Sequence, residues 1–171
     1  MFKRLVGIGV AFTILSGVVT AKVMDWREYS GQEGGVAILM PGAPEKSEKD
    51  LPNGCKISSV AVSLGSSYYS VSFSGIDKGL LQKNSAEQLL DMSQNGSISA
   101  AKGTLRAKRS FTLGATPGRE FVYDTTSNLT LKQRQYIFGD RLLQVVYVEP
   151  PKSESEPEIT RYFDSLRFIK P

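Results

Sequence analysis

The segment "LKQRQYIFGDRLLQVVYVEP", residues 131–150, has the clearest hairpin pattern of the chain. Gly139 and Asp140 separate two strand-like runs, and a two-residue loop of this kind matches the twist of a β-hairpin. Residues 142–148 are almost entirely apolar, which is typical of a strand covered on both faces. The segment therefore predicts an antiparallel hairpin whose second strand lies near the centre of a sheet.

Alternating polarity extends this sheet to earlier parts of the chain. In "SSYYSVSFSG", residues 66–75, aromatic and valine side chains fall on one side and serines on the other, the pattern of a half-buried strand. Residues 56–66 supply its partner, with a turn near Gly65. Residues 109–125 predict two more strands around a Gly-Ala-Thr-Pro-Gly turn.

The segment "GGVAILMPGAPEK", residues 34–46, contains an apolar run that ends in a proline-glycine turn. Val36 to Met40 are predicted to form a first strand covered on both faces, because their side chains do not alternate in polarity. Pro41 has no N–H to donate, so strand pairing is predicted to stop at Met40. A loop that grips a ligand is the alternative interpretation, and the strand is favoured over it.

A helix is predicted to begin after Asn84 or Ser85. Either residue can cap the helix, and Glu87 or Gln88, three residues further on, can complete a capping box. Gly96 is predicted to end this helix or to mark a break in it.

A second helix is predicted at the C-terminus, with Ser155 as its N-cap and Glu158 three residues later. Its apolar residues recur at helical spacing and are predicted to pack on the core: Ile159, Tyr162, Phe163 and Leu166. Together these elements predict an α+β domain. It consists of an antiparallel sheet of about six strands with a mid-chain helix and a C-terminal helix packed on it.

Residues 1–21 have the features of a signal peptide. Two basic residues precede an uncharged apolar run from Leu5 to Val19, and small residues precede a cleavage point after Ala21. Cleavage leaves residues 22–171 as a single globular domain, exported to a periplasm, a lumen or the extracellular space. The alternative is that the segment is retained and anchors the chain to a membrane, which is the one membrane contact expected.

The composition excludes several kinds of site. The sequence has no histidine, which removes Ser-His-Asp and Cys-His catalysis and histidine-ligated zinc or copper. The acidic residues are scattered and form no calcium-binding loop. The net charge of +4 includes two basic residues of the signal segment, so nucleic-acid binding is not expected. No metal or other cofactor is predicted.

Cys55 is the only cysteine of the chain, so it cannot form an internal disulfide. It also lies too far from the cleavage point to be the lipid-modified first residue of a mature lipoprotein. Cys55 is predicted to be a small buried or incidental residue, with cross-linking to a partner as the alternative.

Several of these segments together resemble the PsbP-like superfamily, which includes thylakoid-lumen photosystem II proteins and DcrB-type periplasmic lipoproteins. The resemblance is carried by "EGGVAILMPGAPE", the middle helix, "PGREFVYD", "RQYIFGDRLLQVVYV" and "RYFDSLRF". It implies an α/β/α sandwich around an antiparallel sheet, in an exported, non-catalytic protein that binds or stabilises envelope or membrane-complex partners. Metal sites described for some photosystem members involve histidine, so no metal residue is carried over to this chain.

Basic residues of the predicted sheet form the candidate partner-binding site. Lys132, Arg134 and Tyr136 alternate along one strand and therefore share one side of it. They predict a basic strip with an aromatic tip, suited to an anionic partner, and Arg119 and Arg141 are the further candidates. Solvated strand faces and the protection of sheet edges by charged residues explain these residues equally well.

The sequence therefore predicts an exported non-catalytic domain, not an enzyme, that binds an unidentified protein or anionic envelope component. The alternative is a small exported hydrolase that uses carboxylates brought together in space, or Ser99 with Lys102 at the S-x-x-K spacing of a serine and its base. The partner motifs S-D-N and K-T-G of that enzyme class are missing. A carrier of anionic ligands would need an apolar pocket where Tyr162 and Phe163 are predicted to pack.

Overall fold

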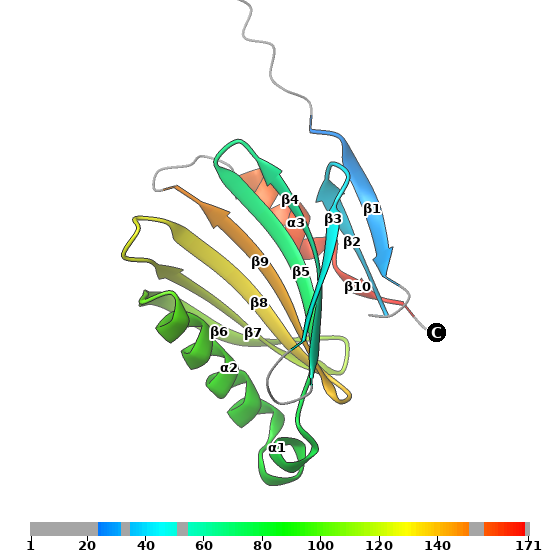
Figure 1. Cartoon of the computed structure of the whole chain (residues 1–171), viewed down its shortest axis with the longest axis vertical. Coiled ribbons are helices and arrows are strands. Elements are labelled where there is room, and N and C mark those ends of the chain that lie inside the picture. Colours follow the sequence, from blue (N-terminus) through cyan, green and yellow to red (C-terminus); the bar gives the residue numbers. More distant parts are fainter. Residues whose placement is uncertain (1–23, 32–34, 51–54, 151–155, 170–171) are drawn as a thin grey trace, which may run out of the picture.

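The computed structural model describes residues 24–31, 35–50, 55–150 and 156–169. At its centre lies a seven-stranded antiparallel sheet in the order β3-β4-β5-β9-β8-β7-β6 (Figure 1). The strands of this large sheet are β3 (Glu45–Asp50), β4 (Lys56–Leu64), β5 (Ser67–Gly75), β6 (Thr104–Leu113), β7 (Thr116–Asp124), β8 (Thr130–Phe138) and β9 (Arg141–Glu149). A small antiparallel sheet in the order β1-β2-β10 consists of β1 (Trp26–Gly31), β2 (Val36–Pro41) and β10 (Arg167–Phe168).

The described part of the chain also contains three helices, namely α1 (Lys78–Lys83), α2 (Ala86–Ala100) and α3 (Glu156–Asp164). α2 packs on β7 and β8 on one face of the large sheet, whereas α3 and the small sheet cover the other face (Figure 1). This arrangement confirms the predicted α+β architecture with helices packed on an antiparallel sheet. The described strands number ten in two sheets, more than the predicted six.

Two-residue turns beginning with glycine connect three of the hairpins of the large sheet, β4–β5, β6–β7 and β8–β9. Gly65, Gly114 and Gly139 have φ angles of 58°, 62° and 60°, in the left-handed region that glycine adopts without steric cost. Glycine at the first turn position is typical of the type II′ turn. The predicted Gly139-Asp140 turn is therefore confirmed, and β9 is the fourth of the seven strands, as the prediction of a central strand requires.

The core lies between the large sheet, α3 and β2. The Tyr162 ring of α3 meets the Tyr69 ring of β5 edge-on at 5.2 Å, and its hydroxyl donates a hydrogen bond of 2.7 Å to the carbonyl oxygen of Ser70. Burying one such aromatic side chain contributes roughly 1.5–3 kcal/mol. The predicted core positions of the C-terminal helix are all buried: Ile159, Tyr162, Phe163 and Leu166.

α2 begins as predicted but continues further. The Ser85 hydroxyl accepts a hydrogen bond from the Gln88 amide, and the Gln88 side chain accepts one from the Ser85 amide, which completes the capping box. The prediction that Gly96 ends or breaks this helix is wrong, because the helix runs through it to Ala100. A Cβ atom at Gly96 would have no neighbour within 4 Å, so its absence creates no gap in the packing.

Three strands, β1, β3 and the two-residue β10, were not predicted, and β2 extends further than predicted. β1 and β3 carry mostly charged and polar residues, and β3 is exposed along its whole length, so neither has a period-two apolar pattern. β2 includes Pro41, which is paired with Trp26. The prediction that pairing stops at Met40 is therefore wrong by one residue. A proline without an N–H is tolerated there because it stands at the end of its strand.

The predicted signal segment, residues 1–21, and the predicted cap Ser155 lie outside the described residues. Within the described ranges, no helix has the length and apolar character needed to span a membrane.

Candidate partner-binding surface

The register of the large sheet places Lys132, Arg134 and Tyr136 of β8 on the face that carries α3. Their neighbours on β9 across the ladder are Tyr147, Val145 and Leu143, which all belong to the core between the sheet and α3. The three predicted residues therefore share one side of their strand. Their depth in the protein differs, and this difference decides which of them a partner can reach.

Arg134 lies at the centre of an ion-pair network that connects three strands and α3. Its Nε donates to Glu120 Oε2 at 2.6 Å, and its Nη1 donates to Asp164 Oδ1 at 2.8 Å. Arg109 Nε donates to the other Glu120 oxygen at 2.9 Å. The Arg134 side chain is only 13 % exposed, whereas Arg109 is 63 % exposed. Arg134 therefore holds α3 on the sheet, and Arg109 presents the accessible guanidinium.

Glu120 carries the negative charge shared by these two arginines. Burial alone would raise the pKa of its carboxyl, but the hydrogen bonds from Arg109 and Arg134 outweigh that effect and lower the pKa below its ordinary value. Glu120 therefore stays ionised. A lowered pKa suits an ion pair, whereas a general acid in a hydrolase needs a raised one.

Lys132 lies on the same face but does not belong to this ion-pair network. Its ammonium lies 5.8 Å from the centre of the Phe163 ring, and no described carboxylate lies within ion-pair distance of it. Arg106, at the end of the same face, pairs with Asp124 at 3.4 Å and is largely exposed. We refer to Arg106, Arg109, Lys132 and Arg134 together as the basic surface.

Tyr136 does not form the aromatic tip that the sequence predicts. Only 1 % of its surface is exposed, because its ring packs edge-on between Phe111 at 5.4 Å and Phe168 at 6.0 Å. Burial raises the pKa of its hydroxyl to about 12. The rings beside the cations are instead the partly buried Phe111, with the Arg134 guanidinium at 5.6 Å, and the buried Phe163.

Arg119 lies on the opposite face of the large sheet, beneath α2. It is 4 % exposed and donates hydrogen bonds to Glu87 and Asp91, one turn apart on the helix. The bond from Arg119 lowers the pKa of Asp91. Arg119 therefore connects α2 to the sheet and does not share a surface with Lys132.

Arg141 stands at the β8–β9 turn, 3.9 Å from Asp140, at the other end of the hairpin from Lys132. The five predicted residues therefore do not form one continuous surface.

Arg106 and Arg109 belong to the basic surface but are not among the five residues predicted from the sequence. The signal for them was present, because β6 is a basic strand that pairs with the strand carrying Glu120.

Ser99 and Lys102 are both exposed, and the helix that would hold them one turn apart ends between them. Ala101 caps α2, and Lys102 adopts a left-handed φ of 48°. A lysine that acts as a base for serine is activated by desolvation, which this position does not provide. Among the described residues, no cluster of acidic or cysteine side chains is arranged to hold a metal ion.

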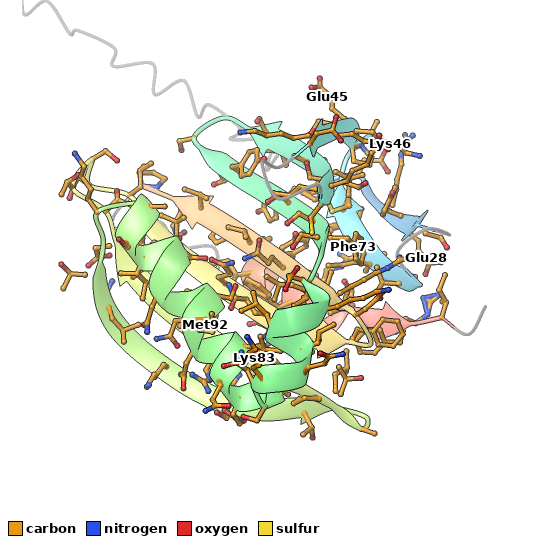
Figure 2. All side chains as sticks on the ribbon, turned by 60° about the horizontal axis from the view of Figure 1, so that its bottom comes forward. Glu28, Glu45, Lys46, Phe73, Lys83 and Met92 are labelled. Atoms are coloured by element: carbon orange, nitrogen blue, oxygen red, sulfur yellow. The ribbon has the colours of Figure 1, made fainter. Side chains whose placement is uncertain are left out.

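An open cleft of about 380 Å³ lies between β1 and the wing of the large sheet formed by β3, β4 and β5. Phe73 and Val60 line its apolar part, and Lys46 and Glu48 line its polar part. Figure 2 labels Phe73 and Lys46. The Lys46 ammonium lies 5.8 Å from the centre of the Tyr29 ring.

The space between the sheet and α3, where a carrier would need its pocket, is filled by Tyr162 and Phe163. Cys55, just before β4, is partly buried next to Gly75.

No protein-family model matches the sequence, and no curated protein matches it either. The fold is shared with solved structures, among them the following two. The solution structure of cyanobacterial PsbP from Synechocystis sp. PCC 6803 superposes with a TM-score of 0.60 at 11 % identity, over 91 % of this chain and 99 % of that one. The chain has a PsbP-like fold. The crystal structure of Pseudomonas aeruginosa PA94, a protein of unknown function, superposes with a TM-score of 0.50 at 13 % identity, over 85 % and 98 % of the two chains.

The PsbP-like fold confirms the resemblance noted in the sequence, and at these identities it is the fold alone that is shared. The superposition with cyanobacterial PsbP covers most of both chains.

Proposed function

We propose that this chain is an exported, non-catalytic domain that binds an anionic protein or envelope component through its basic surface. Export is supported by the signal-peptide features of residues 1–21. A non-catalytic role is supported by the PsbP-like fold together with the resemblance in sequence, which implies partner-binding members in exported compartments.

The observation that carries the proposal is the position of Lys132. Its ammonium is held beside the Phe163 ring without a described carboxylate at ion-pair distance, whereas Arg106, Arg109 and Arg134 each have one. An anionic partner therefore gains an attraction at Lys132 without first displacing an internal ion pair. Arg109 and Arg106 extend the positive potential along the sheet and favour association with negatively charged surfaces.

Arg134 contributes to the surface in an indirect way. Because it is mostly buried and bound to Glu120 and Asp164, it orients the carboxylates and α3 and does not offer a free cation. We therefore expect the partner to contact Lys132 and Arg109. Arg134 maintains the geometry of the surface.

The test is affinity capture from the envelope fraction of the host with the wild-type protein, Lys132→Glu and Lys49→Glu. Lys49 is an exposed lysine of β3, at the far edge of the same sheet, so its variant makes the same charge change away from the basic surface. We expect at least one envelope component to be lost with Lys132→Glu and retained with Lys49→Glu. Equal recovery of every component by both variants would contradict the proposal.

A further inference from the structure

β6 forms one edge of the large sheet, and β7 is its only strand partner in the described part of the chain. Seven consecutive residues from Thr104 to Ser110 are exposed, so neither face of this part of the strand is covered. A bulge interrupts the register between Leu105 and Ala107, but pairing with β7 is regular from Ala107 to Leu113. The regular part offers an open edge of backbone groups for another strand to pair with.

The hairpin geometry identifies which backbone groups face outward. Leu113 and Thr116 flank a two-residue turn, so they form a hydrogen-bonded pair, and such pairs alternate with non-hydrogen-bonded ones along the ladder. The N–H and C=O groups of Thr112, Ser110 and Lys108 therefore point away from β7. The position of Pro117 agrees, because it lies opposite Thr112 in a pair that needs no N–H from it.

The charge of this edge selects its partner. β6 contains Arg106, Lys108 and Arg109 and no acidic residue, whereas the other edge strand, β3, mixes three acidic with two basic residues. Two copies of β6 side by side would bring like charges together, which destabilises cross-strand pairs. A strand rich in carboxylates would instead meet Lys108 on the α2 face and Arg109 on the α3 face, as the register with Phe121 and Glu120 shows.

We propose that β6 binds an extended acidic segment of a partner protein, which adds a strand to the large sheet. Backbone hydrogen bonds to Lys108, Ser110 and Thr112 supply the affinity, and the cations of β6 supply the preference for acidic sequences. This inference goes beyond the proposed function, because it assigns binding to the backbone edge of β6, which shares Arg106 and Arg109 with the basic surface but does not require Lys132.

The direct test is amide hydrogen exchange of the full chain with a synthetic peptide of alternating glutamate and threonine, about as long as β6. Binding at the edge slows exchange at Lys108, Ser110 and Thr112 and leaves Phe111, which is already paired with Gly118, unchanged. Unchanged exchange at the three outward amides under saturating peptide would overturn the inference. The matched peptide of alternating lysine and threonine should give no protection.

Three variants separate the backbone contribution to binding from the charge contribution. Ser110→Pro removes an outward N–H at an edge position where proline is tolerated, and we expect it to weaken peptide binding by about tenfold or more, while Ser110→Ala keeps wild-type affinity. Lys108→Glu, which leaves the backbone intact, should weaken binding of the acidic peptide and improve binding of the lysine peptide. If Ser110→Pro and Ser110→Ala bind equally well, strand addition is wrong.

Lys132→Glu distinguishes this inference from the proposed function. The edge inference expects this variant to bind the acidic peptide nearly as well as the wild type. A loss of peptide binding in Lys132→Glu together with normal binding in Ser110→Pro would assign the peptide to the basic surface and overturn the edge inference.

Discussion

At the residue scale, Glu120 is the carboxylate on which the geometry of the basic surface depends. It is 11 % exposed and accepts hydrogen bonds from both Arg109 and Arg134. Glu120→Gln leaves Arg134 with Asp164 alone, so we expect a loss of about 2 kcal/mol in the free energy of unfolding. Urea denaturation of the wild type and the variant measures this loss. Asp164→Asn removes the exposed partner of the same arginine and should cost under about 1 kcal/mol. Equal costs for the two variants would contradict the central place given to Glu120.

The same residue gives a pH dependence of known sign. The folded pKa of Glu120 is below the ordinary carboxyl value of 4.5, so its contribution to stability is fully present above pH 4.5 and is lost as the pH falls through the folded pKa. The difference in stability between wild type and Glu120→Gln should therefore shrink on acidification below pH 4.5. Denaturation curves over a pH series measure this difference. A difference that grows toward acid pH would show that the pKa is raised.

Residue patterns in the sequence predict which face of a strand a side chain occupies better than they predict how deeply that side chain is buried. The alternation of Lys132, Arg134 and Tyr136 correctly placed all three on one side of their strand. It could not show that Phe111 and Phe168 enclose Tyr136, since those rings come from distant parts of the chain. The burial of Arg119 has the same kind of cause. Its partners lie on α2, and a basic residue in a strand gives no sign of which helix will cover it.

At the scale of elements, α2 allows a clean test of its continuity. Gly96 lies inside the helix on an open side, so Gly96→Ala should stabilise the protein by about 0.5–1 kcal/mol. Gly114→Ala, in a turn with a φ of 62°, should destabilise it by about 1–2 kcal/mol. Thermal unfolding of both variants provides the comparison. A destabilising Gly96→Ala would mean that the helix is interrupted there.

Elements with an apolar period were predictable from sequence, and elements without one were not. β8, β9, α2 and α3 were expected from hairpin, capping and helical-spacing signals, and all four are present. β3 is a strand only because it pairs with β4, since its own residues are all charged or polar and exposed. β10 has two residues and exists because Ala37 and Val36 of β2 pair with Arg167 and Phe168.

At the scale of the whole molecule, the small sheet and α3 close one side of the large sheet, and contacts between distant segments hold them there. The Leu39 amide of β2 donates to the Ser165 hydroxyl just after α3 at 2.9 Å. Contacts between residues so far apart in the chain produce no local pattern in the sequence. This is why the sequence could predict an α+β sandwich but not its division into two sheets.

The proposed export is a property of the entire chain and can be measured on it. Expression in the host should give a mature protein that begins at Lys22, since small residues precede a cleavage point after Ala21. Mass spectrometry of the exported fraction identifies the first residue. Recovery of the intact N-terminus in the membrane fraction would contradict cleavage and would favour an anchored protein.

The central claim is that the basic surface around Lys132 contacts an anionic partner. The test is photo-cross-linking in the host with a photoreactive lysine analogue that keeps the ammonium group, placed at position 132 and, as a control, at position 49. We expect a discrete cross-linked product from position 132 that weakens as ionic strength rises, and none from position 49. No product from position 132, or the same product from both positions, would contradict the claim.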